Sequence, residues 1–206
     1  MRSRIALVTT CLVALFAGFA GPLHAEELGY TTLSAGWSSP VGGPVADAYQ
    51  SGFTLAASYR TPVAEQFLSG MEIGYTWLSL DSGSLENRNP GSTFAGGDLG
   101  FLSITTENDF LLGAPGSTAR PFVNLGLGFF RSFADEVTQT SGGTASRYST
   151  GVYEGSFFGF HGGVGVLIQR DRFGIRLDAN YQHLCQGGQD LEFFPVRAGI
   201  IFYPKK

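Results

Sequence analysis

A strict two-residue alternation near the C-terminus is the feature that most limits what this chain can fold into. From Phe173 to Gln182 the odd positions are all apolar, and the even positions are glycine, arginine, aspartate, asparagine and glutamine. Successive side chains of a β-strand point to opposite faces, so this segment predicts a strand with one apolar and one polar face. Arg176 and Asp178 lie in the middle of the polar face. That pattern suits a wall with lipid on one side and a polar interior on the other.

The same alternation recurs along the chain and predicts eight strands. We expect them at 31–38, 52–60, 68–80, 94–106, 121–133, 156–169, 173–182 and 194–203. In the fourth strand, which we allow to run on to Leu112, the alternation breaks near Leu102. A β-bulge that shifts the phase by one residue would explain this break. The connectors are alternately long and short, as in barrels with long extracellular loops and short periplasmic turns. The predicted fold is an all-β, eight-stranded antiparallel up-and-down transmembrane β-barrel.

The N-terminus predicts export from the cytoplasm. Residues 1–25 have the form of a secretory signal peptide, with Arg2 and Arg4 before an apolar run and Ala25 at the expected cut. The remaining residues, 26–206, form the predicted barrel domain in the cell outer membrane. Two of the 13 basic residues lie in the leader, which leaves 11 against 17 acidic residues and a net charge of −6. No basic patch is present in the sequence, so we expect no nucleic acid partner.

Three segments carry a family resemblance. They are RPFVNLGLGFF (120–130), FGFHGGVGVLIQRDRFGIRLDANYQ (158–182) and FPVRAGIIFY (194–203). These segments resemble the later strands of the small eight-stranded outer-membrane barrels, the OmpA/OmpX-like group. Members of that group serve as structural anchors, adhesins or lipid-modifying enzymes, so the resemblance implies a fold and a location and leaves the activity open. It also implies two partners, the outer-membrane lipid and the assembly machinery that reads a C-terminal aromatic residue. Here Phe202 and Tyr203 match that signal, although residues 204–206 follow them.

The polar faces of the predicted strands supply charged residues to the barrel interior. An eight-stranded barrel is only wide enough for side chains to fill it, so an open diffusion pore is not expected. We interpret the charged residues as a lumen network of ion pairs that plugs the barrel. A gated proton or ion path through rearranging pairs is the alternative. The predicted members are Arg60, Glu72, Asp98, His161, Arg176, Asp178 and Arg197.

One constellation at the predicted outer rim could carry chemistry. His183 and Cys185 are two residues apart and therefore share a strand face, and Glu192 is close enough in sequence to orient the histidine. A base beside a nucleophile, oriented by a carboxylate, is the arrangement that nucleophilic catalysis needs. The segment is similar to the His-x-Ser pair and glutamate of the eight-stranded lipid A deacylases, with Cys185 in place of serine. We expect no cofactor and no metal site, because the three histidines lie far apart in the sequence.

These observations favour a non-enzymatic role, either in envelope structure or in binding an extracellular ligand or surface through the loops. A lipid A-modifying outer-membrane hydrolase that uses His183 and Cys185 is one alternative. A soluble periplasmic lipocalin-like ligand binder is another. That last fold would reverse the two faces and bury the mid-strand charges in its core, which disfavours it.

Overall fold

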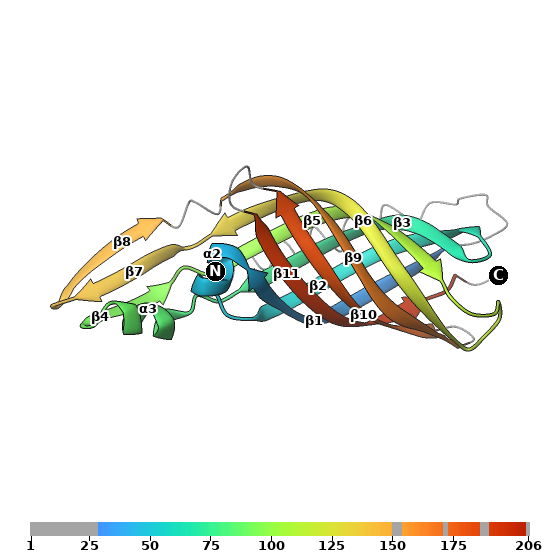
Figure 1. Ribbon diagram of the computed structural model, residues 1–206, viewed down its shortest axis with the longest axis horizontal. Coiled ribbons are helices and arrows are strands. Elements are labelled where there is room, and N and C mark those ends of the chain that lie inside the picture. The colour runs from blue at the N-terminus through green and yellow to red at the C-terminus, as the bar shows by residue number, and fades with distance from the viewer. Residues whose placement is uncertain (1–28, 150–153, 171–172, 186–189, 205–206) are drawn as a thin grey trace.

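The computed structural model describes residues 29–149, 154–170, 173–185 and 190–204, and eight of its strands close into a barrel (Figure 1). The expected signal peptide, residues 1–25, lies outside the described residues. Each wall strand pairs antiparallel with the next in the chain, and the last pairs with the first. The predicted eight-stranded up-and-down barrel is confirmed. The wall strands are β1 (Tyr30–Gly42), β2 (Gly52–Ala64), β3 (Phe67–Leu78), β5 (Leu99–Leu111), β6 (Ala119–Ala134), β9 (Gly155–Gln169), β10 (Phe173–Cys185) and β11 (Leu191–Phe202).

The two ends of the barrel differ in the length of their connections. At one end, β2 and β3 are joined by residues 65–66, β5 and β6 by residues 112–118, and β9 and β10 by residues 170–172. The other end carries the connections 43–51, 79–98, 135–154 and 186–190. Because bacterial barrels have short periplasmic turns and longer extracellular loops, the second end is the extracellular one. The predicted alternation of connector lengths is present in the structure.

The fourth wall strand differs from its prediction in both position and phase. β5 begins at Leu99, and its pairing with β3 and β6 continues without a shift, so the β-bulge expected near Leu102 is absent. The apparent break has another cause. Leu99 and Phe101 are buried and point into the barrel, while Leu102 is half-buried on the outer face. Apolar side chains on both faces hid the alternation from the sequence pattern.

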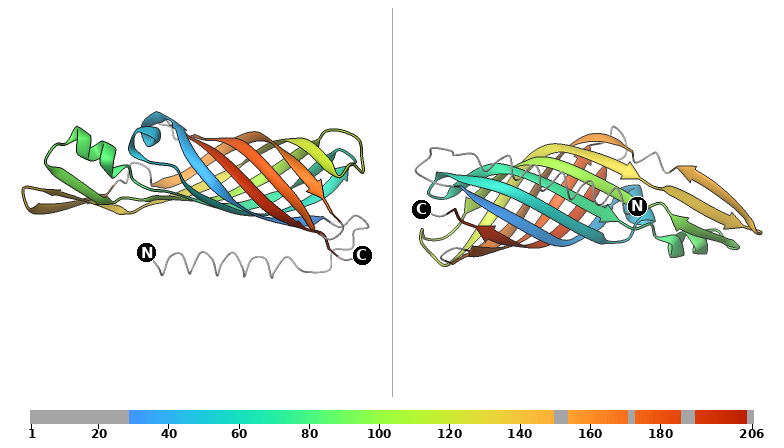
Figure 2. Two further views of the ribbon diagram at one scale, coloured as in Figure 1. Left: turned by 90° about the horizontal axis from the view of Figure 1, so that it is seen from below. Right: turned by 180° about the vertical axis from the view of Figure 1, so that it is seen from behind.

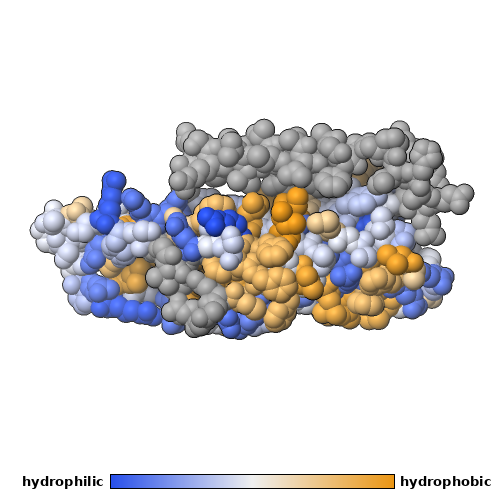
Figure 3. Space-filling view, turned by 90° about the horizontal axis from the view of Figure 1, so that it is seen from above, coloured by the Kyte–Doolittle hydropathy of each residue, from blue (hydrophilic) through white to orange (hydrophobic). Residues whose placement is uncertain are grey.

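The outer surface of the wall is a belt of apolar side chains. Figure 3 shows hydrophobic residues gathered over the barrel, whereas the extracellular end is mostly hydrophilic. Trp37 is 61% exposed and Phe129 is 68% exposed, and a belt of such side chains marks a surface that contacts lipid rather than water. A closed barrel leaves no unpaired sheet edge in lipid, so its backbone meets the requirement for crossing a membrane. The fold and the belt are those of an outer-membrane protein.

Two apolar clusters occupy the two ends of the lumen. The first helix, α2 (Gly43–Ala48), covers the extracellular mouth and buries Val45 completely. The extracellular cluster consists of Val45, Tyr49, Leu78, Leu99, Phe101, Phe130, Phe157, Leu184, Leu191 and Phe193. The periplasmic cluster consists of Tyr30, Leu68, Leu111, Phe122, Leu167 and Ile201. The polar interior of the barrel is therefore enclosed between two hydrophobic layers.

A second, smaller sheet stands beyond the extracellular end of the barrel (Figure 2). Its strands are β4 (Ser92–Gly96), β7 (Glu136–Ser141) and β8 (Thr144–Ser149), in the order β4-β7-β8, with the helix α3 (Ser82–Arg88) beside it. We call it the protruding sheet. The sequence pattern predicts loops for these residues or, for Phe94 to Gly96, the start of the fourth wall strand. Among the described residues, no helix is long and apolar enough to cross a membrane.

Candidate functional sites

The lumen network lies between the two apolar clusters, and five wall strands supply the residues predicted for it. β2 contributes Arg60, β3 Glu72, β9 His161, β10 both Arg176 and Asp178, and β11 Arg197, and all six side chains are buried. The structure thus brings six of the seven residues predicted for the lumen to one place. Asp98 does not join them, because it precedes β5 in the extracellular part, where its Oδ1 accepts a hydrogen bond from the Leu80 N–H (3.4 Å).

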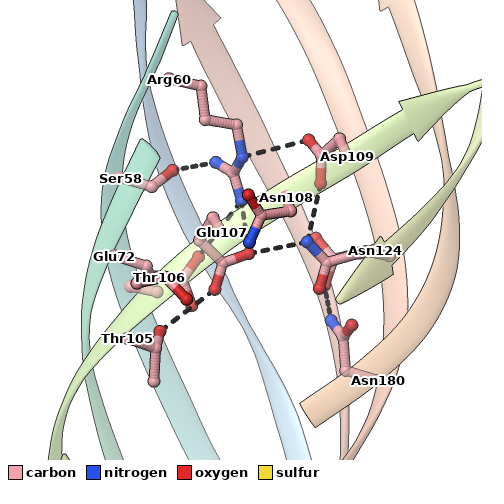
Figure 4. Close-up of polar contacts among 12 residues, drawn as sticks. Ser58, Arg60, Glu72, Thr105, Thr106, Glu107, Asn108, Asp109, Asn124 and Asn180 are labelled. Carbon is pink, nitrogen blue, oxygen red and sulfur yellow. Dashed lines mark hydrogen bonds and ion pairs between the residues drawn. The ribbon is translucent and has the colours of Figure 1, made fainter. Parts of the chain in front are cut away.

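Two carboxylates outside the predicted set complete the network. Glu107 and Asp109 lie on β5, point inward and are fully buried. Arg60 donates from Nη2 to Glu107 Oε2 (2.9 Å), and its Nε lies 3.1 Å from Asp109 Oδ2 (Figure 4). Asn124 on β6 donates to both acids, at 2.9 Å and 2.7 Å. Both acids follow Thr105 with a two-residue period, so an unbroken alternation through β5 is the signal that identifies them.

The other two arginines complete a continuous set of contacts. Arg176 donates to both oxygens of Asp109, at 2.6 Å and 3.2 Å, and from Nε to Asp178 (3.0 Å). Its guanidinium also lies 4.0 Å from the ring centroid of Phe122, in the periplasmic cluster. Arg197 joins Asp178 (2.9 Å) and contacts Glu72. Arg60 also lies 3.7 Å from Glu72, so each arginine contacts at least two acids. Glu72, Asp109 and Asp178 each contact two arginines.

His161 contacts the lumen network on one side and packs closely against the wall strand β6 on the other. Its Nε2 lies 3.0 Å from Glu107 Oε1. Its pairing partner on β6 is Gly126, where a Cβ atom would lie 2.3 Å from His161 Cε1 and 2.1 Å from the carbonyl oxygen of Thr106. Only glycine leaves room for the imidazole at this position. With three guanidinium groups facing four carboxylates, a protonated His161 would balance the charge of the network.

The rim constellation lies on the outer face of the wall, near the extracellular end. His183 stacks on Phe160, with ring centroids 5.0 Å apart, and its side chain is 19% exposed. Its Nδ1 lies 3.4 Å from Glu192 Oε1, and its Nε2 lies 3.5 Å from Asp190 Oδ2. Glu192 is thus beside the histidine, as the sequence predicted, and Asp190 is a second acidic neighbour outside the predicted set.

Cys185 is exposed on the same face as His183, but the geometry does not make it an activated nucleophile. In a nucleophile–histidine–acid triad, one ring nitrogen faces the acid and the other faces the nucleophile. Here both ring nitrogens of His183 face carboxylates. Within the described ranges, no group of three or more histidine, cysteine, aspartate or glutamate side chains is arranged to hold a metal ion.

One edge of the protruding sheet is covered by a helix, and the other edge is exposed. α3 covers the β4 edge: the Phe94 N–H donates to Glu86 Oε1 (3.1 Å), and the Ser92 N–H donates to the Asn89 carbonyl (3.1 Å). On the other edge, every residue of β8 is exposed. In the part of the chain that the structure describes, nothing covers the outer side of β8.

The free edge of β8 presents a regular row of backbone groups. β7 and β8 are joined by a two-residue turn at Gly142 and Gly143, whose φ values are +57° and +83°. Both residues of such a turn need the left-handed conformation that glycine adopts without strain. The pair next to a two-residue turn is hydrogen-bonded, and the pairs alternate from there. The N–H and C=O groups of Ala145, Arg147 and Ser149 therefore point away from β7.

Asp81 organises the base of the protruding part. Its carboxylate accepts hydrogen bonds from the Ser84 hydroxyl (2.7 Å) and the Ser84 N–H (3.0 Å), and from Gln50 (3.1 Å). These contacts make Asp81 the N-cap of α3 and lower the pKa of its carboxyl below the ordinary value, with the hydroxyl of Ser84 the largest cause. Burial raises the pKa of Asp98 nearby.

Comparison with solved structures places the fold among the outer-membrane barrels. Neisserial surface protein A is 13% identical, with a TM-score of 0.53, and the match covers 84% of this chain and 96% of that one. A major outer membrane protein from Thermus thermophilus is 12% identical, also at 0.53, over 88% of this chain and 100% of that one. The outer membrane enzyme PagL is 14% identical, with a TM-score of 0.47, over 84% of this chain and 99% of that one. No protein-family model and no curated protein sequence matches the chain.

Proposed function

We propose that the protein is a non-enzymatic surface-interaction protein of the outer membrane, in which the barrel is an anchor and the protruding sheet is the binding element. The observation that carries the proposal is the open edge of β8, whose six residues are all exposed. Exposed edges are usually blocked because they pair with other chains. Here the β4 edge is blocked by α3, and the β8 edge contains neither lysine nor proline.

The expected partner is an extended polypeptide segment that adds a strand beside β8. Such partners gain affinity from main-chain hydrogen bonds and specificity from alternate side chains. Ala145, Arg147 and Ser149 offer the outward backbone groups, so a segment of about six residues would satisfy them. Arg147 is the single charged residue of the strand, and it favours a segment with an acidic residue opposite it.

The barrel itself supports an anchoring role better than transport. The lumen network joins every charged member to an opposite charge, and an apolar cluster lies above and below it. The cavity just below the extracellular cluster, lined in part by Thr76, Ser103 and Gln182, has a volume of about 10 Å³. That space holds about one water molecule and no continuous path. We therefore propose that the lumen is plugged.

A peptide-display selection tests the proposed function. A random peptide library is selected on proteoliposomes that carry the wild-type protein and, in parallel, the Arg147→Pro variant. Proline removes the outward N–H of residue 147 and leaves the bonds to β7 in place, as prolines on edge strands do. We expect peptides that bind the wild type and not the variant. Peptides enriched equally on both proteins would contradict the proposal.

The enzymatic alternative has its own discriminating result. Outer-membrane lipid is extracted from cells that produce the wild-type protein, His183→Ala or Cys185→Ala, and its acyl chains are analysed by mass spectrometry. Because neither ring nitrogen of His183 faces Cys185, we expect the three lipid profiles to be the same. A lipid modification that depends on both residues would overturn the non-enzymatic assignment.

A further inference from the structure

A groove crosses the lipid-facing side of the wall over β1, β11, β10 and β9. The groove is shallow and wide open to the lipid, with a volume of about 650 Å³. Its lining combines glycine, alanine and valine with Leu177, and it includes Asp178 and Arg197, whose side chains are buried toward the lumen. Large apolar side chains flank it: Trp37 on β1 lies opposite Val196, and Phe160 on β9 lies beyond Val164. The lining residues include Ala35, Gly36, Val164, Ala179, Val196 and Ala198. The groove is therefore a hollow in an otherwise bulky apolar belt, at the depth of the hydrocarbon chains.

A polar cluster lies on the extracellular side of this groove, beyond Tyr181, whose hydroxyl donates a hydrogen bond to Glu192. His183 follows Ala179 by four residues on the same face of β10, which is about 13 Å along the strand. Glu192 and Asp190 flank the imidazole, and their side chains are 31% and 51% exposed. Two carboxylates against one imidazole leave the cluster negatively charged whether or not the histidine is protonated. A negative cluster above an apolar groove complements a molecule with a cationic head and an apolar tail.

We propose that the groove and the polar cluster together bind one membrane lipid, a zwitterionic phospholipid with a primary ammonium group. One acyl chain fills the groove, where the short side chains of Ala35, Ala179 and Ala198 leave space for it. The ammonium group meets Glu192 and Asp190, the two acids at the rim. This site is separate from the protruding sheet, so it stands or falls independently of the proposed function.

The position of the two tryptophans allows a direct test. The chain has two tryptophans, and Trp37 lies opposite Val196 at the groove, whereas Trp77 lies on β3 beyond β2. In the full-length Trp77→Phe protein, Trp37 is the single fluorescent indole. The protein is reconstituted in phosphatidylglycerol vesicles that contain an equal minor fraction of either phosphatidylethanolamine or phosphatidylglycerol with brominated acyl chains. Bromine quenches indole fluorescence on contact, so quenching of Trp37 reports which lipid occupies the groove.

We expect the brominated phosphatidylethanolamine to compete about threefold better for the site, the size expected of one partly exposed ion pair. Glu192→Gln should remove this preference, and Glu136→Gln, the same change on the protruding sheet, should keep it. Ala179→Phe fills the groove from the lipid side and should reduce the quenching by both lipids. All variants are checked for a folded barrel by their gel mobility before and after boiling.

Two results would overturn the proposal. Equal quenching by the two brominated lipids in the wild-type background would show that the head group is not recognised. Weak quenching by both lipids, with a Trp37 emission that changes as the protein-to-lipid ratio rises, would show that a second copy of the chain covers the groove.

Discussion

Replacing Arg176 by methionine should destabilise the barrel more than any single change on its surface. Arg176 is 1% exposed, is bidentate with Asp109 and also binds Asp178. Methionine keeps an unbranched apolar stem and removes the guanidinium. The variant therefore leaves Asp109 and Asp178 buried with one positive partner fewer each.

The expected loss follows from the contacts removed. Breaking a buried ion pair by removing one partner costs about 3–5 kcal/mol, because the remaining charge stays buried without compensation. Arg60 still contacts Asp109 and Arg197 still contacts Asp178, so both acids keep one partner and the cost stays within that range. Arg176→Lys retains the charge but cannot contact both acids in the same geometry, and we expect it to lose about half as much.

Urea unfolding in lipid vesicles measures these differences, with tryptophan emission and gel mobility as independent probes. Arg147→Met, which removes the same group from an exposed position on β8, should change the free energy of unfolding by no more than about 0.5 kcal/mol. Adding Asp109→Asn to Arg176→Met should recover part of the loss, because it reduces the excess of negative charge that the first change leaves in the lumen network. If Arg176→Met is as stable as the wild type, or if the second change adds a further full loss, the reasoning is wrong.

Three further predictions concern other parts of the molecule. Phe101→Ala opens a cavity in the extracellular cluster and should cost about 3–5 kcal/mol in the same unfolding assay. Gly126→Ala places a Cβ atom 2.1 Å from the Thr106 carbonyl oxygen. In urea unfolding it should lower the free energy of unfolding more than a substitution to alanine at a lipid-facing position does. The lowered pKa of Asp81 means that α3 is stabilised above the ordinary carboxyl pKa and loses this support as the pH falls through the lowered value. NMR chemical shifts of α3 should follow that titration, and Asp81→Asn should abolish it.

The barrel could be predicted because lipid and lumen impose opposite chemistry on alternate residues. That rule failed where the lumen itself is apolar. Leu99 and Phe101 point inward into the extracellular cluster, and a sequence pattern cannot separate them from lipid-facing residues until the pairing with β3 and β6 is known. The same error misplaced Asp98 in the lumen and hid Glu107 and Asp109.

The protruding sheet escaped prediction for a different reason. All six residues of β8 are exposed, so neither face of the strand needs apolar side chains and no alternation develops. Its two glycines, Gly142 and Gly143, were the local sign of a hairpin. The rim constellation was partly predictable, since strand period places His183 and Cys185 on one face. The contact of His183 with Asp190 depends on how β10 and the segment before β11 approach each other, which sequence spacing does not specify.

The wall strand β6 and the protruding strand β7 are nearly continuous, so the protruding sheet extends directly from the barrel wall. Only Asp135 separates β6 from β7, so the strand that lines the bilayer runs on as the strand that leaves it. Six residues of β7 at about 3.3 Å each carry the turn at Gly142 and Gly143 about 20 Å past the end of the wall. A foreign peptide inserted into that turn would lie at the tip of the protruding sheet, away from the membrane surface and accessible to antibodies. The fold is thus a ready scaffold for displaying epitopes on living cells.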